Sequence, residues 1–204
     1  LIMCGISGLI NCNQNFTKSL IGMTRKLAHR GPDDEGFLIL DNGKNYHLAS
    51  SHTNPDSVDF HSLGSSKIES FSPIKPIIGF GHRRLSIVDL SPNGHQPMSR
   101  DNSTWLVFNG EIFNYIELRN ELAKLGLVFK TDTDTEVILA AYETWGLKCF
   151  EKFNGMWGLA ILDLEKRQVH LCRDRYGIKP LYYRNSESSF SFASEIKAFT
   201  ALGD

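Results

Sequence analysis

The sequence has few cysteines, almost no excess charge and no long apolar run. Its 204 residues include 22 lysines and arginines against 23 aspartates and glutamates, a formal net charge of −1. This balance offers no electrostatic attraction for a nucleic acid or an anionic membrane. No apolar stretch reaches the roughly 18 residues that a membrane span requires, and the first residues lack the basic and apolar regions of a secretion signal. We therefore expect a cytoplasmic protein without a nucleic-acid or membrane partner.

The four cysteines, at positions 4, 12, 149 and 172, are too few and too scattered for a disulfide framework. None of them forms a C-x₂-C pair, so we predict no metal site. Cys172 alternates with apolar residues in a strand pattern and is expected to act as a small buried hydrophobic residue. Only Cys4, in the stretch Met-Cys-Gly, raises a chemical question.

The chain is long enough for one domain with a substantial core. Helical spacing of apolar residues predicts helices over 17–28, 114–125 and 134–146, the last capped by Asp134 and Thr135. Strands, two consecutive helices and further strands predict an α+β domain with mainly antiparallel sheet. The stretches with strand-like composition are 5–10, 34–40, 79–90, 104–110, 156–164, 168–174, 180–184 and 189–194.

Residues 41–76 differ from the rest, because they are rich in Ser, Asn, Asp and Pro and have weak periodicity. We interpret this tract as a long surface excursion with one short strand near Tyr46–Ala49.

Cys4 has two interpretations. Most cysteines in such a position are buried and inert. A nucleophilic cysteine needs a base, because at its ordinary pKa of about 8.5 only a few per cent of the thiol is ionised at pH 7. None of the seven histidines stands in a recognisable pairing pattern with a cysteine. The α-amino group of a chain that began at Cys4, with a pKa of about 7.7–8.0, would suit neutral pH. This interpretation requires residues 1–3 to be a leader and a start methionine.

The stretch FNGEIFNY (108–115) contains an Asn-Gly pair, which is most simply a turn between a strand and a helix. A side-chain amide beside a glycine N–H at a strand end can also form an oxyanion hole. One such donor stabilises a transition state by about 3–4 kcal/mol. Asn109 and Gly110 are therefore candidates for that role.

Two charged positions allow a similar choice. Arg83 or Arg84 could be a solvated strand residue, and Asp134 could only cap a helix. An arginine can also hold a carboxylate with two hydrogen bonds, and an aspartate can hold an ammonium group. A site with both charges would recognise a free amino acid.

Seven motifs in fixed order resemble the glutaminase domain of glutamine-hydrolysing asparagine synthetases. That domain belongs to the class II glutamine amidotransferases, which use an N-terminal nucleophile. The resemblance extends from Met3 to about Leu202, and RRLSIVD and RDRYGIKPLYY favour the asparagine synthetase branch. The motifs are MCGISG, AHRGPDDEG, GHRRLSIVDLS…GHQPM, FNGEIFNY, TDTDTEVIL, RDRYGIKPLYY and FASEIKA.

The resemblance implies a fold and a reaction. The fold is an αββα sandwich of two antiparallel sheets between helix layers. Cys4 would attack the side-chain amide of L-glutamine, with its own amino group as base, to form a γ-glutamyl thioester and release ammonia. Asn109, through its side chain, and Gly110, through its N–H, would form the oxyanion hole.

The resemblance also implies a binding pocket for the substrate. Arg84 would bind the carboxylate of glutamine, and Glu111 and Asp134 would lie near its ammonium group. Backbone around Ile87 and Val88 would complete the pocket, within a substrate-binding stretch that also includes Leu85 and Ser86.

Two departures from the family pattern affect these expectations. The tract 41–76 is longer than in the common bacterial enzyme, which leaves open a divergent amidotransferase with another ammonia acceptor. The ATP-binding loop of the family, roughly S-G-G-x-D-S, is also missing; SLGSS (62–66) lacks the Gly-Gly pair and the Asp. We therefore expect residues 4–204 to be one glutaminase domain excised from a longer protein. A linked C-terminal synthetase domain would bind ATP and magnesium, and this domain would need no cofactor.

Two further alternatives remain at this point. A non-catalytic domain of the same fold could bind glutamine or a partner, since Leu1 and Ile2 would block the amino group of Cys4. A peptidase or amidase of the same nucleophile class is more remote, because Arg84 and Asp134 together favour a free amino acid. A homodimer is left open.

Overall fold

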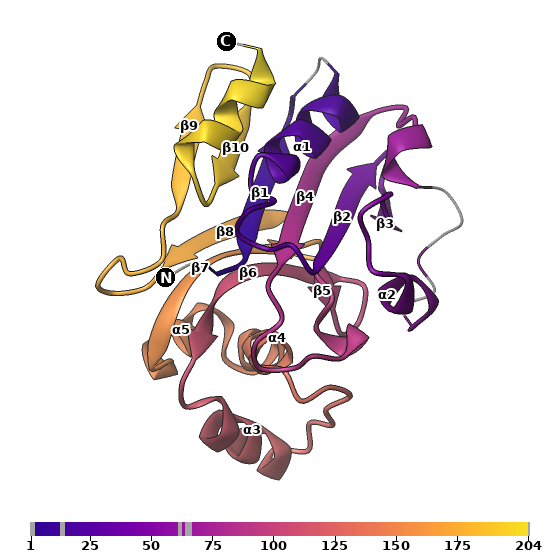
Figure 1. Ribbon diagram of the computed structural model, residues 1–204. Helices are drawn as coiled ribbons and strands as arrows, with labels where there is room; N and C mark the ends of the chain where they lie inside the picture. Colours follow the sequence, from indigo (N-terminus) through magenta and orange to yellow (C-terminus); the bar gives the residue numbers. More distant parts are fainter. Residues whose placement is uncertain (1–2, 13–14, 61–62, 64–66, 204) are drawn as a thin grey trace.

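The computed structural model describes residues 3–12, 15–60, 63 and 67–203. Its strands form two antiparallel sheets that stack face to face, and helices cover the outer faces (Figure 1). This is the αββα arrangement that the family resemblance implied. Of the residues outside the described ranges, positions 1–2 belong to the expected leader and 62 and 64–66 to the SLGSS stretch.

The larger sheet has six strands in the order β3-β2-β4-β1-β10-β9. Strand β1, which begins directly after Cys4, lies inside this sheet with β4 on one side and β10 on the other. The nucleophile candidate is therefore attached to one of the best-paired strands of the molecule. The six strands are β1 (Gly5–Ile10), β2 (Asp34–Asp41), β3 (Lys44–Leu48), β4 (Pro76–Arg84), β9 (Tyr182–Asn185) and β10 (Phe190–Ala193).

The smaller sheet has four strands in the order β5-β6-β7-β8. Strand β6 pairs with β7 along its whole length, but with β5 over only two residues. In the described part of the chain, one edge of β6 is therefore without a strand partner over most of its length. The four strands are β5 (Met98–Ser99), β6 (Thr104–Ile112), β7 (Gly155–Asp163) and β8 (Gln168–Arg173).

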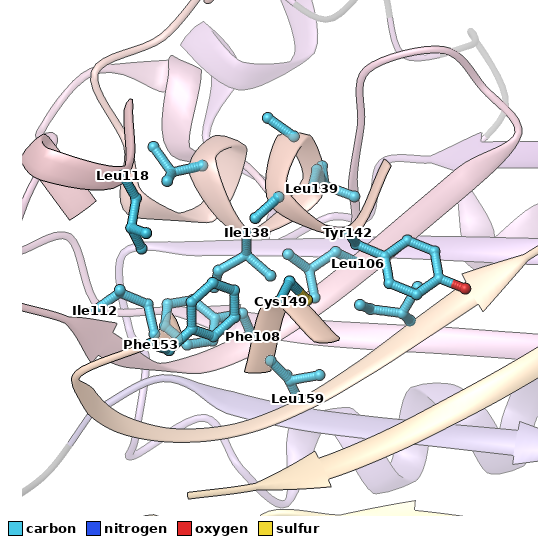
Figure 2. Packing of buried hydrophobic residues seen from close by; sticks show 14 of the residues in the cluster. Leu106, Phe108, Ile112, Leu118, Ile138, Leu139, Tyr142, Cys149, Phe153 and Leu159 are labelled. Atoms are coloured by element: carbon cyan, nitrogen blue, oxygen red, sulfur yellow. The ribbon is translucent and has the colours of Figure 1, made fainter. Parts of the chain in front are cut away.

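Three buried clusters join the four layers. Helix α1 (Phe16–Arg25) and the 3₁₀ helix Ile196–Leu202 pack on the outer face of the larger sheet. A second cluster fills the space between the two sheets. Helices α3 (Tyr115–Lys124), α4 (Asp134–Trp145) and α5 (Cys149–Lys152) enclose the third cluster against the smaller sheet (Figure 2).

The predicted helical stripes are mostly confirmed. Leu20, Met23, Thr24 and Leu27 are all buried beneath α1 and the turn that follows it. The prediction that Leu125 continues the apolar stripe of the second helix is wrong. Leu125 lies after the end of α3, and its side chain is 58% exposed.

The tract 41–76 was predicted as a surface excursion, and this is only partly correct. The short strand is confirmed as β3, and a helix, α2 (Pro55–Phe60), also forms there. Leu48, Ala49 and Ile68 are buried, and Ile68 and Leu48 belong to the cluster beneath α1. The tract therefore contributes to the core, which its polar composition concealed.

Two predicted boundaries are wrong. The strand expected over 79–90 ends at Arg84, and residues 85–90 leave the sheet. Asp134 and Thr135 do not cap α4; the side chain of Thr133 does so by accepting the Glu136 N–H at 3.1 Å. Among the described residues, none of the helices combines the length and the apolar composition needed to span a bilayer.

Candidate active site

A cleft opens where the start of β1 meets the end of β4, the middle of β6 and the first turn of α4. It contains about 500 Å³ of empty space, counting the part that is open to solvent. Most of the predicted site residues meet here, although Asn109 and Ser86 are not among those that line it. The lining residues are Met3, Cys4, Arg84, Leu85, Ile87, Val88, Asp89, Gly94, Gln96, Phe108, Gly110, Glu111, Thr133, Asp134 and Thr135.

The Cys4 thiol is partly buried at the inner end of the cleft. The Leu85 N–H donates to Cys4 Sγ at 3.3 Å, and the thiol lies 3.5 Å from Leu85 O. Arg30 Nε donates to Cys4 O at 3.0 Å, which fixes the backbone of this residue. Burial raises the pKa of the thiol above its ordinary value. Ionisation of this thiol near neutral pH therefore requires a base. No histidine is a hydrogen-bond partner of Cys4 in the described part of the chain.

Asn109 and Gly110 lie inside β6, opposite Gly158 and Trp157 of β7. The predicted turn at this Asn-Gly pair is therefore wrong. The Asn109 side chain is fully buried, and neither of its amide atoms has a hydrogen-bond partner among the described residues. A buried polar group without a hydrogen-bond partner costs about 1–3 kcal/mol of stability.

Position 110 requires glycine, because neighbouring atoms approach its Cα too closely to leave room for a side chain. A Cβ atom at this position would lie 2.3 Å from Met156 O and 2.6 Å from the Phe108 ring. Only glycine leaves the backbone at this point free to line the cleft.

Arg84 is anchored by the chain that follows β4. Its Nη1 donates to Ser91 O at 2.7 Å, and its Nη2 donates to Asp89 O. The guanidinium lies so close to Gly94 that a Cβ there would be 2.1 Å from Nη2. Burial lowers the pKa of Arg84, and the nearby Asp34 and Asp89 carboxylates oppose that shift.

Asp134 supplies a negative group on the other side of the cleft. Its Oδ2 accepts the Ile112 N–H at 3.0 Å, which holds the start of α4 against the end of β6. Burial, with a smaller contribution from the nearby Glu111 carboxylate, raises the pKa of Asp134 to about 6. The group is mostly ionised at pH 7, so the cleft holds a cation and an anion together.

The stretch after Arg84 forms an open side of the cleft. Ile87 and Val88 are 53% and 41% exposed, so their side chains are not part of a closed pocket. The Ser86 N–H donates to Asp33 Oδ2 at 2.8 Å. Leu85 contributes its backbone to the thiol, as described above.

Sequence reasoning missed several lining residues. Gln96 belongs to the motif GHQPM, and Thr133 and Thr135 belong to TDTDTEVIL, yet only Asp134 was selected from these stretches. Their hydrogen bonds depend on how β6 and α4 pack, which local spacing does not report. Motif membership was the one signal that could have found them.

Comparison with known protein families decides the class of this chain. The sequence model of the family described as glutamine amidotransferase domain matches residues 3–70 and 64–204. The chain belongs to this family. The glutamine amidotransferase domain thus accounts for nearly all of the sequence.

Curated relatives of this glutamine amidotransferase domain are longer proteins. Asparagine synthetase [glutamine-hydrolyzing] 1 of Bacillus subtilis (strain 168) is 36% identical over 202 residues, which cover 96% of the chain and 26% of that protein. Asparagine synthetase [glutamine-hydrolyzing] 2 of the same organism is 38% identical over 96% of the chain and 22% of that protein. The chain thus spans about a quarter of the length of these relatives.

A solved structure has the same fold. The glutamine phosphoribosylpyrophosphate amidotransferase of B. subtilis, complexed with ADP and GMP, superposes with a TM-score of 0.73 at 20% identity. The match covers 98% of this glutamine amidotransferase domain and 44% of that chain.

Proposed function

We propose that this domain hydrolyses the side-chain amide of L-glutamine to glutamate and ammonia. The observation that supports this proposal is a single cleft that holds the Cys4 thiol, the Arg84 cation and the Asp134 anion. A free amino acid carries a carboxylate and an ammonium group, and these two charges complement the two ends of the cleft. A peptidase substrate would lack at least one of them.

The proposed reaction has two stages. Cys4 Sγ attacks the amide carbon of glutamine while its proton passes to a base, which in a chain beginning at Cys4 is the α-amino group. The Asn109 amide N–H and the Gly110 N–H stabilise the oxyanion, the amine leaves as ammonia, and a γ-glutamyl thioester remains. Water then attacks the thioester, which releases glutamate and regenerates the thiol.

In the longer parent protein, we propose that the ammonia is used to make asparagine. This step rests on the relatives named glutamine-hydrolysing asparagine synthetases, of which the chain spans only a part. A linked synthetase domain would supply ATP and magnesium chemistry and consume the ammonia. Another acceptor would leave the glutaminase half of the proposal unchanged.

The test compares Cys4→Ala with Cys12→Ala in the full-length protein, measuring glutamate release from glutamine. Cys12 lies beyond the opposite end of β1, so it is a matched control for loss of a thiol. Cys4→Ala should abolish glutamate release and the mass shift of a trapped thioester, whereas Cys12→Ala should retain both. Unchanged release by Cys4→Ala would refute the nucleophile. Asparagine formation from aspartate, ATP and glutamine tests the parent activity separately.

A further inference from the structure

Among the described residues, the segment of β6 next to Asn109 has no strand partner on one edge. Strand β5 begins only at Met98, which pairs with Leu106, and Ser99 pairs with Trp105. If this register continued, Gln96 would lie opposite Phe108. The backbone of Phe108, directly before Asn109, therefore needs other hydrogen-bond partners.

Two buried side chains provide these partners. The Phe108 N–H donates to Gln96 Oε1 at 2.7 Å. His82, which reaches across from β4 in the other sheet, has its Nε2 at 3.2 Å from Phe108 O. Burial lowers the pKa of His82 to about 3, so the ring is neutral at pH 7. Since a carbonyl can only accept, Nε2 carries the hydrogen.

The other end of the Gln96 amide reaches the first turn of α4. Its Nε2 donates to Thr135 Oγ1 at 3.2 Å, in the first turn of α4 beside Asp134. The Ile112 N–H donates to Asp134 in turn. Two hydrogen-bonded links, one through Gln96 and one through Asp134, thus connect β6 to the first turn of α4.

We propose that Gln96 and His82 are positioning residues for glutamine hydrolysis, holding Phe108 and thereby the adjacent Asn109–Gly110 pair in place; this inference rests on the proposed function. Oxyanion donors act only within about 2.7–3.1 Å of the developing charge. A displacement of about 1 Å can cost on the order of 100-fold in rate. Within the described part of the chain the Asn109 side chain has no hydrogen-bond partner, so its position depends on the backbone beside it.

The experiment uses two matched pairs in the full-length protein. His82→Leu removes the donor to Phe108, whereas His82→Gln keeps an N–H at the same distance from the backbone. Gln96→Met removes both hydrogen bonds of the Gln96 amide, to Phe108 and to Thr135. Thr135→Val removes only the second of these bonds. His82→Leu and Gln96→Met should lower kcat by roughly 10- to 100-fold. His82→Gln should recover most of that loss, and Thr135→Val should raise KM for glutamine with kcat nearly unchanged.

Two controls separate positioning from general damage. The rate at which iodoacetamide alkylates Cys4 should stay the same in all four variants, and the side-chain amide resonances of Asn109 should shift in Gln96→Met. Folded His82→Leu and Gln96→Met with normal kcat would overturn the inference, as would His82→Gln that is no better than His82→Leu. If Gln96→Met does not fold, the His82 pair decides. Failure of the proposed function can be told apart from failure of this inference. In that case the unsubstituted protein itself would show no Cys4-dependent glutamate release.

Discussion

The two sides of the cleft are built in opposite ways. The loop wall, residues 85–89, follows the end of β4 and exposes its apolar side chains; what it offers the thiol is the Leu85 backbone. The strand–helix wall, residues 108–112 with 133–135, is mostly buried and cross-linked by the side chains of Gln96 and Asp134. Groups that must act on a transition state need rigid support, whereas groups that admit a substrate do not. We therefore expect catalytic power to depend on the strand–helix wall.

The largest effect should come from a change that leaves both walls intact. A chain beginning at Cys4 should release glutamate about 10²–10⁴ times faster than one that keeps Met3 attached, because a peptide nitrogen cannot act as the base. Mass spectrometry of each N-terminus, taken with the glutamate assay, checks this. Equal turnover by an intact Met3-bearing chain would mean that another group acts as the base. That group would then belong to one of the two walls of the cleft.

On the strand–helix wall, Asn109→Ala should lower kcat by about 10²–10³-fold, the usual cost of one oxyanion donor. Alkylation of Cys4 should continue at its normal rate, because the thiol is not altered. Steady-state kinetics with glutamine measures the loss. A kcat close to that of the unsubstituted protein would contradict the expectation that catalytic power depends on the strand–helix wall.

Asp134 should affect binding more than turnover. Asp134→Asn should raise KM for glutamine by about tenfold, because a charge-assisted hydrogen bond to the ammonium group contributes roughly 1.5–3 kcal/mol. Since the pKa of Asp134 is about 6, protonation should weaken glutamine binding in the unsubstituted protein as the pH falls through 6. KM measured from pH 5 to pH 8 should show this rise, and Asp134→Asn should lack it. The same rise of KM in Asp134→Asn would assign the pH dependence to another group.

The smallest effect should come from the loop wall. Val88→Ala should change stability by no more than about 0.5 kcal/mol and leave kcat and KM nearly unchanged, because the side chain is largely exposed. Thermal unfolding and glutamine kinetics together check this prediction. A large rise in KM would show that the loop wall closes on the substrate through its side chains.

Local patterns and family motifs together predicted most of the fold and of the site. The stripe of Leu20, Met23, Thr24 and Leu27 follows from helical spacing, which is a local property. Local preference makes a turn the simplest interpretation of the Asn109–Gly110 pair, but pairing with Gly158 and Trp157 of a distant strand overrides that preference.

Long-range geometry also explains the other errors. The polar tract 41–76 hides Ile68, whose burial depends on packing beneath α1 rather than on its neighbours in sequence. The role that we propose for Gln96 follows from the register of Met98 with Leu106 and from the start of β5 only at Met98. No periodicity within GHQPM carries that information.

The interior position of β1 has a consequence for the dynamics of the Cys4 thiol. The first residues of a domain usually fray, since they open at little cost in free energy. Here the strand next to Cys4 is bonded to β4 through Gly5–Ile10 and to β10 through Ser7–Ile10. Opening it would break two ladders of the sheet at once. Backbone amides such as those of Gly8 and Ile10 should therefore exchange with solvent only in near-global unfolding events, and the thiol beside them should keep its place for as long as the domain remains folded.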